Sequence, residues 1–253
     1  MTANKDKIRA LLKGIETGDP QAVLVVNENE YVQHNPHTRE GNVGLAELFK
    51  QIAKTEPKVK MVRAFEDKDF VFAHMEYNFS SVKAAFEIFR FEDGYAVEHW
   101  DNMQPLQALN ESGRSMLDGP TTSEEHELTE INREKISLFV NDILINRRLN
   151  SIADYVCSDH FIQHNPTLAD GISNLSLALT AKSGGEFNII YSRIHRILAE
   201  GNFVLSISEG LLEGKQSAFY DLFRIAEGKI VEHWDTIEQI PPRDEWQNDN
   251  GKF

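Results

Sequence analysis

The chain has 253 residues, 41% of them hydrophobic, and its 26 Lys and Arg against 40 Asp and Glu leave a formal net charge of −14. This composition supports a packed core, excludes a disordered chain, and argues against nucleic acid and anionic membranes as partners. The chain contains neither about 18 consecutive apolar residues nor the apolar core of a signal peptide, so we expect a cytoplasmic protein.

Two polar sequence words each occur twice. QHNP at 33–36 returns at 163–166, and VEHWD at 97–101 returns at 231–235. The copies are 130 residues apart for the first word and 134 for the second, which is the length of an ordinary domain. We therefore predict two tandem homologous domains, 1–110 and 126–253, joined by a linker at 111–125 that is rich in Ser, Gly, Pro and Thr.

Each half begins with helical patterns and continues with strand patterns. Residues 4–19 and 129–150 carry apolar residues at helical spacing, a second helix follows each, and 44–54 and 172–182 predict a third. The remainder of each half, up to VEHWD, alternates as strands do. This order indicates an α+β fold in which helices pack in a curved, mostly antiparallel sheet.

The alternation of side chains in a strand divides VEHWD between two faces. His99 and Asp101 share one face, and Glu98 and Trp100 share the other. His233 and Asp235 make the same pair in the second copy.

The preceding strand adds a third polar group, whose position depends on the hairpin turn. A two-residue Asp93-Gly94 turn would set Glu87 opposite Trp100, whereas a three-residue loop at 92–94 would set it opposite His99. We expect the three-residue loop.

In the second copy, the same loop would place Asp221 beside His233 and Asp235. A base and a hydrogen-bond donor in one apolar pocket are what proton abstraction next to a carbonyl requires.

The order "YVQHNP", a strand ending in His74, and "FEIFRFEDGYAVEHWD" resembles the SnoaL-like polyketide cyclase family of the NTF2-like superfamily. The resemblance covers both halves of the chain. It implies two cone-shaped α+β barrels with deep pockets, and cofactor-free aldol condensation with an acidic residue as general acid and base.

Site residues follow from the resemblance position by position. The family's acid matches Asp101 and Asp235, and its pocket Asn matches Asn35 and Asn165. The positions two and fourteen residues before the acid match the four residues His99, His233, Glu87 and Asp221, where the last two are acidic although characterised cyclases can carry His.

Three further histidines are candidates for the pockets. His34 and His164 either line the pocket or cap the turn that contains the proline. His74 aligns with Ile207, so we expect the first repeat to be the active one if only one is. Arg90 and Arg224 are expected to pair with a buried acid.

Two alternatives to a SnoaL-like acid/base enzyme, a cyclase or an isomerase, stay open. One is a non-catalytic module that binds a small ligand, because this scaffold hosts both. The other is a metal-dependent enzyme that would use His34, His99 and Asp101, although no tight ligand spacing supports a metal and none is predicted. We expect no cofactor, a small-molecule ligand, and an intrachain pseudo-dimer that could form a further homo-oligomer.

Overall fold

The computed structural model describes residues 3–19, 21–27 and 29–253, and the chain divides into two compact units. The first unit comprises Met1–Pro105 and Ile240–Phe253, and the second comprises Leu106–Gln239. The units therefore differ from the predicted domains in two segments. Residues 106–125, which include the predicted linker, belong to the second unit, and residues 240–253 belong to the first.

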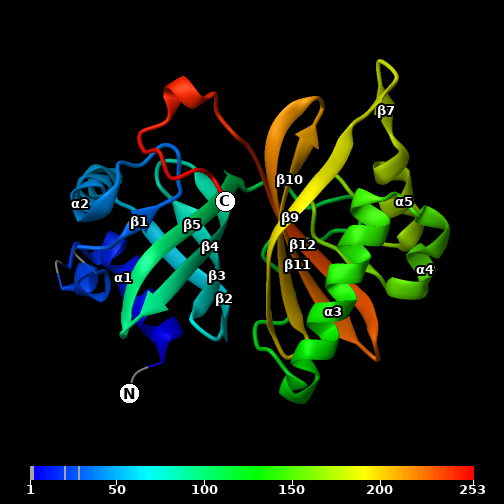
Figure 1. The fold of residues 1–253 in the computed structure, drawn as a ribbon, viewed down its shortest axis with the longest axis horizontal. Coiled ribbons are helices and arrows are strands. Elements are labelled where there is room, and N and C mark those ends of the chain that lie inside the picture. The colour runs from blue at the N-terminus through cyan, green and yellow to red at the C-terminus, as the bar shows by residue number, and fades with distance from the viewer. Residues whose placement is uncertain (1–2, 20, 28) are drawn as a thin grey trace. The chain divides into compact units, whose positions relative to one another are not determined.

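The first unit follows the predicted order of helices and strands (Figure 1). Its elements are α1 (Asn4–Thr17), β1 (Val32–Gln33), α2 (Gly41–Ile52), β2 (Lys58–Asp67), β3 (Phe70–Asn78), β4 (Val82–Glu92) and β5 (Tyr95–Pro105). The second helix of the prediction is only a 3-10 turn at Ala22–Val25.

The second unit repeats this order. Its elements are α3 (Thr129–Phe139), a π-helical turn (Val140–Ile145), α4 (Ile152–Tyr155), β6 (Ile162–Gln163), α5 (Ile172–Thr180), β7 (Lys182–Ser183), β8 (Glu186–Phe187), β9 (Ile189–Glu200), β10 (Phe203–Leu212), β11 (Lys215–Ala226) and β12 (Lys229–Gln239). Short 3-10 turns lie at Ala53–Thr55, His126–Leu128, Leu149–Ser151 and Arg243–Glu245. None of the helices in the described ranges is long and apolar enough to cross a bilayer.

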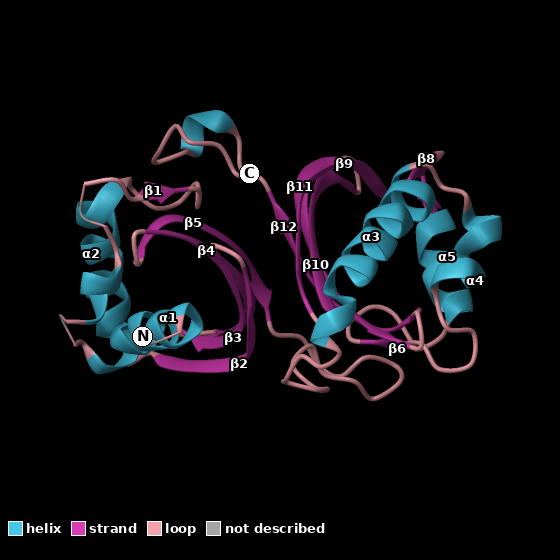
Figure 2. Cartoon of the chain, turned by 60° about the horizontal axis from the view of Figure 1, so that its bottom comes forward, coloured by secondary structure: helices cyan, strands magenta, loops and turns pink. Residues whose placement is uncertain are grey.

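Each unit has one five-stranded sheet with the same topology. The orders are β1-β5-β4-β3-β2 and β6-β12-β11-β10-β9, and only the short first strand of each order is parallel to its neighbour. Figure 2 shows both sheets curved, with α1 on the concave side of the first. The predicted α+β class with two tandem units is confirmed.

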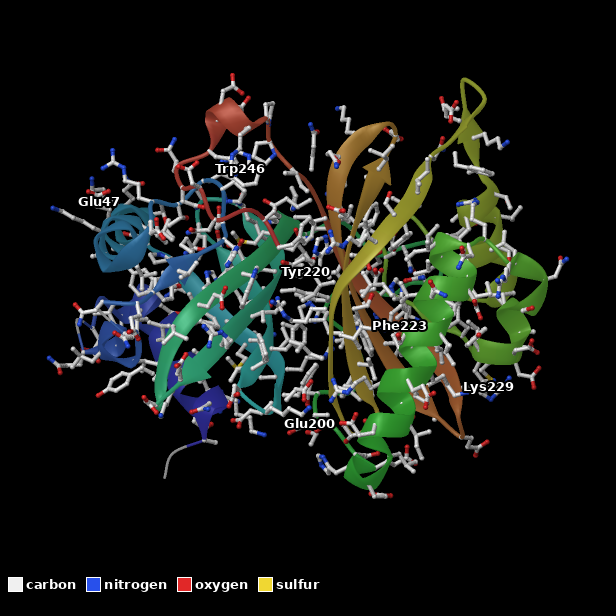
Figure 3. The ribbon with its side chains drawn as sticks, viewed as in Figure 1. Glu47, Glu200, Tyr220, Phe223, Lys229 and Trp246 are labelled. Atoms are coloured by element: carbon white, nitrogen blue, oxygen red, sulfur yellow. The ribbon has the colours of Figure 1, made fainter. Side chains whose placement is uncertain are left out.

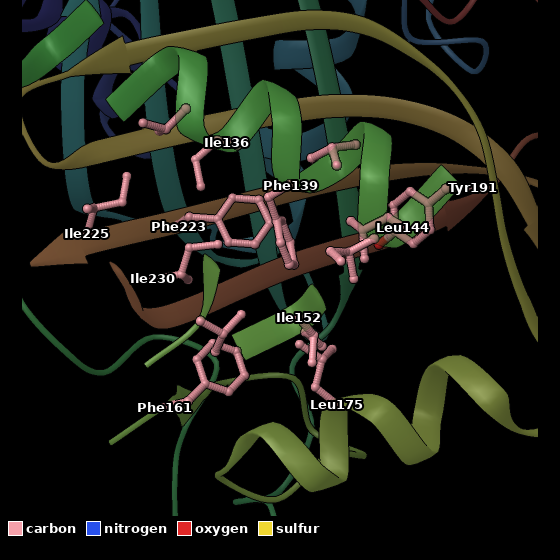
Figure 4. Close-up of a cluster of buried hydrophobic side chains, with 14 of the residues drawn as sticks. Ile136, Phe139, Leu144, Ile152, Phe161, Leu175, Tyr191, Phe223, Ile225 and Ile230 are labelled. Carbon is pink, nitrogen blue, oxygen red and sulfur yellow. The ribbon is translucent and has the colours of Figure 1, made fainter. Parts of the chain in front are cut away.

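Amphipathic helices fill the concave sides. Ile8, Leu11, Leu12 and Ile15 recur at helical spacing and are buried against the first sheet. Helix α1 ends at Gly18, which adopts the left-handed conformation (φ 69°) and donates its N–H to the Gly14 carbonyl. In the second unit the equivalent core centres on Phe139, Leu144 and Phe223 (Figure 4).

The hairpin between β4 and β5 differs from both predicted registers. Glu92 pairs with Tyr95 across a two-residue turn, but a bulge at Val97 shifts the register, so Glu87 pairs with Asp101. The resulting register differs by two residues from that of the three-residue loop, and an even difference keeps the same face. The second repeat has the same bulge, so Asp221 pairs with Asp235.

Residues 106–125 follow the last strand of the first sheet but belong to the second unit, and residues 240–253 follow the last strand of the second sheet but belong to the first unit. We call these two stretches the exchanged segments. An Asn in each exchanged segment holds the QHNP turn of the unit to which the segment belongs. Asn110 Nδ2 donates to the carbonyls of Gln163 and Leu168, at 2.7 and 2.8 Å. Asn248 Nδ2 donates to those of Asn35 and Thr38, at 2.7 and 3.0 Å. The unit boundaries thus follow hydrogen bonds to a distant turn, not the composition of the linker.

A glycine substitution tests the packing of segment 106–125 on the second unit. A Cβ on Gly201, in the turn after β9, would lie 2.0 Å from the Glu124 carbonyl oxygen, whereas one on Gly214, after β10, meets nothing within 4 Å. Both glycines have positive φ, so Ala costs roughly 1–2 kcal/mol at either. We expect Gly201→Ala to lower the unfolding temperature more than Gly214→Ala in calorimetry, and equal losses would contradict this packing.

Candidate functional site

In each unit, the QHNP motif lies beside the VEHWD motif on neighbouring strands. Strand β6 runs parallel to β12, and Gln163 lies level with His233. Gln163 Oε1 accepts two hydrogen bonds, from the Asn165 backbone N–H and from His233 Nδ1, both at 2.9 Å. Because a backbone N–H can only donate, the amide orientation is determined. Gln33 makes the same two bonds in the first repeat.

The second ring nitrogen of each histidine faces a carboxylate. His233 Nε2 lies 3.0 Å from Asp221 Oδ1, and His99 Nε2 lies 2.6 Å from Glu87 Oε2. Both nitrogens of each ring therefore face oxygen acceptors, which is the pattern of an imidazolium. Burial opposes this charge, but the hydrogen bond to Asp221 and the charges of Asp235 and Asp221 outweigh it and raise the pKa of His233.

The adjacent acid is held by the Asn of QHNP. Asn165 Nδ2 donates to Asp235 Oδ2 at 2.6 Å, while Asn165 Oδ1 accepts the Thr167 N–H. Asn35 and Asp101 form the same pair in the first repeat, also at 2.6 Å. The predicted grouping of acid, His, second acid and Asn therefore exists in both repeats.

Asp235 has the environment of a proton-exchanging acid. It is 7% exposed, and its Oδ1 receives no hydrogen bond from the described part of the chain. Burial raises the pKa of Asp235 to about 6; the His233 charge opposes this shift and the Asp221 charge adds to it. The carboxyl group thus changes its charge near neutral pH.

A cavity of about 40 Å³ lies against this acid. It is bordered by Asp221, His233, Asp235, Asn165 and Tyr191, and otherwise by apolar side chains from the α3 region, β9, β11, β12 and α5. Figure 4 labels three of the lining residues, Tyr191, Leu144 and Leu175. The volume holds a few water molecules, so a larger ligand requires the lining side chains to move apart.

Tyr191 is a site residue that sequence reasoning missed. Its hydroxyl donates to Asp221 Oδ1 at 3.1 Å, and burial followed by the Asp221 charge raises its pKa well above the ordinary range. The first repeat places Tyr77 beside Glu87 instead, from β3 and not from the outermost long strand. Because the two tyrosines are not at equivalent positions, comparing the repeats gives no signal for them.

His34 lies on the other face of β5, away from His99 and Asp101. Its Nε2 is 2.9 Å from Glu98 Oε1, and its ring stacks on Trp100 at a centroid distance of 4.6 Å. Arg90 Nε donates to the second Glu98 oxygen at 2.7 Å. The same network joins His164, Glu232, Trp234 and Arg224.

The sequence left open whether His34 and His164 line the pockets or cap the turn, and these contacts place both on the face opposite the site acids. Both residues belong to a His-Glu-Arg network in which burial raises the pKa of Glu98, but hydrogen bonds from His34 and Arg90 outweigh it and lower that pKa. The same balance lowers the pKa of Glu232. The arginines pair with a buried acid as predicted, but with these glutamates.

His74 is also outside the pocket. Strand β3 pairs His74 with Phe86, the neighbour of Glu87, so His74 and Glu87 point to opposite faces. Its Nδ1 lies 2.8 Å from Arg63 Nη1, and its ring packs edge-on against Phe86. The contrast between His74 and Ile207 therefore says nothing about which pocket is active.

The two sites differ at one buried cation. Lys252, 3% exposed, places its Nζ 2.8 Å from the Asp101 carbonyl oxygen and 3.8 Å from Asp101 Oδ1. The corresponding residue of the other exchanged segment is Arg114, which bonds to Asp170 at 3.0 Å. Asp170 is not one of the site acids.

The site residues fit a metal poorly. Glu87, His99 and Asp101 bring one potential ligand atom each within 4.8 Å of one another, and so do their second-repeat equivalents. A metal needs a neutral imidazole nitrogen with its lone pair free. Both nitrogens of His99 and of His233 already contact oxygen acceptors. The metal set of His34, His99 and Asp101 is excluded by the opposite orientation of His34.

No family model and no curated protein matches the chain. Among solved structures, it is similar to TsrD from Streptomyces laurentii, with 21% identity and a TM-score of 0.35 over 40% of this chain and 87% of that one. It is also similar to an NTF2-like protein of unknown function from Cytophaga hutchinsonii, with 18% identity and a TM-score of 0.36 over 42% and 93%. A LEH-like epoxide hydrolase of M. tuberculosis has 21% identity and a TM-score of 0.36 over 44% and 84%.

The raised pKa of Asp235 predicts a pH-dependent stability. The folded state binds this proton more tightly than the unfolded chain, so the contribution is complete below about pH 4 and is lost as the pH rises through about 6. Relative to Asp235→Asn, the unaltered protein should lose about 2 kcal/mol of unfolding free energy between pH 4 and 7. Denaturant unfolding measures this, with exposed Asp159→Asn as the control. A constant difference would contradict the prediction.

Proposed function

We propose that the second repeat catalyses proton transfer at a carbon next to a carbonyl group in a small molecule. The observation that carries this proposal is the buried Asp235, which borders the cavity and whose Oδ1 receives no hydrogen bond from the described residues. A pKa of about 6 leaves this acid mostly ionised at neutral pH and still basic enough to take a proton from carbon.

The chemistry needs only side chains of this site. Asp235 Oδ1 removes a proton from the substrate carbon, and the electron pair of the broken C–H bond moves to the carbonyl oxygen as an enolate. The positive charge on His233 stabilises that negative charge, and Asp221 and Gln163 hold the ring in place. Returning the proton to a different carbon gives an isomer.

Ring closure by aldol addition is the finer version that the SnoaL-like resemblance suggests. In that version the enolate carbon attacks a second carbonyl of the same molecule, and the Asp235 proton goes to the new alkoxide. A chain long enough to fold back on itself exceeds a cavity of about 40 Å³, so this version requires the cavity to widen. Isomerisation or exchange in a small substrate requires less movement.

A non-catalytic binding pocket is the second candidate. The same mostly apolar lining with a few polar groups suits a small ligand. Under this alternative the raised pKa of Asp235 would have no catalytic role.

Deuterium exchange into small β-keto compounds, followed by NMR, distinguishes these functions. We expect exchange to rise with pH through about 6 and to fall about 10²–10⁴-fold in Asp235→Asn, with little change in Asp101→Asn. The two variants remove equivalent acids, so each is the matched control of the other. If the double variant with Asp101→Asn and Asp235→Asn exchanged deuterium as fast as the unaltered protein, Asp235 would be excluded as the base. Saturable binding without exchange would favour the binding module.

A further inference from the structure

The buried charges of the two sites are balanced in different ways. The second site has two carboxyl groups, Asp221 and Asp235, and one cationic ring, His233. The first site has two carboxyl groups as well, but it has a second cation in Lys252. With both carboxyl groups ionised and the ring protonated, the second site keeps one uncompensated negative charge, whereas the Lys252 ammonium compensates that charge in the first site.

Lys252 is held at this position by the segment that carries it. The Asn248 side chain bonds to two carbonyls of the QHNP turn, and Asn250 Nδ2 donates to the Gln33 carbonyl at 3.0 Å. The Gly251 carbonyl lies 2.9 Å from His34 Nδ1. Trp246 caps the 3-10 turn of the same segment by donating to the Pro241 carbonyl (Figure 3).

We propose that Lys252 is a positioning residue that keeps the Asp101 carboxyl ionised, so that only the second site exchanges protons with a substrate. The last part rests on the proposed function, whereas the effect on Asp101 does not. The groups that face Asp101 are Glu87, His99, Tyr31, Tyr77 and Lys252, and those that face Asp235 are Asp221, His233 and Tyr191. His164 acts on Asp235 only from the opposite face of the strand. Lys252 is the member of the first set with no cationic equivalent in the second.

The other exchanged segment provides the matched control. Segments 110–114 and 248–252 both read Asn, two residues, Gly and a basic residue, so Arg114 corresponds to Lys252. Arg114 points to Asp170, at 41% and 28% side-chain exposure, and not to a site acid. A basic residue at this position therefore has an effect on the site only in the first repeat.

NMR titration of the aspartate carboxyl carbons in the full chain tests the proposal without any substrate. In Lys252→Met, which keeps the length of the side chain, we expect the Asp101 signal to titrate at higher pH than in the unaltered protein. Arg114→Met should leave both Asp101 and Asp235 unchanged. Unchanged titration of Asp101 in Lys252→Met would overturn the proposal.

A reciprocal variant covers the case in which Lys252→Met detaches the segment. Asp101→Asn keeps the side-chain shape and the carbonyl acceptor but removes the negative charge. We expect the Lys252 ammonium to lose its proton at lower pH in that variant, measured by ¹⁵N NMR of lysine Nζ, and an unchanged titration would also overturn the proposal. Absence of deuterium exchange in every variant, with both titration shifts present, would contradict the proposed function but not the role of Lys252.

Discussion

The rest of each site depends on the two-residue parallel pairing of a short strand with the last strand of its sheet. That pairing sets Gln33 level with His99 and Gln163 level with His233. One amide oxygen then fixes both the turn that follows and the orientation of the imidazole. The short strand ends at the Gln, and the Asn two residues later, directly before the proline, reaches the acid two residues beyond the His.

The same pairing explains why each repeat contains both the QHNP and the VEHWD motif. Gln binds His on the concave face, His binds Glu and Trp on the convex face, and Asn binds Asp on the concave face. Every side chain of QHN thus has its partner in EHWD. The contacts on the convex face are structural. In the second unit, His233, Asp235 and Asn165 on the concave face border the cavity.

Much of this arrangement follows from the sequence, and the failures have physical causes. The duplication predicted two units, and strand alternation grouped Glu87, His99 and Asp101 correctly. The register was wrong because the turn has two residues and not the expected three, and because a bulge adds one residue at Val97 that no local pattern marks. His34 was ambiguous because a residue after a two-residue strand has no alternation to follow. Lys252 and Tyr191 reach the sites through long-range packing, which spacing along the chain does not reveal.

The exchange of segments makes neither half of the chain self-sufficient. A fragment ending at Pro105 would lack the residues that hold its own QHNP turn, and one beginning at residue 126 would lack Asn110. Dissecting the protein at its apparent linker would therefore damage both sites at once. In genetic terms, a lesion near residue 250 is a lesion of the first repeat, and one near residue 110 is a lesion of the second.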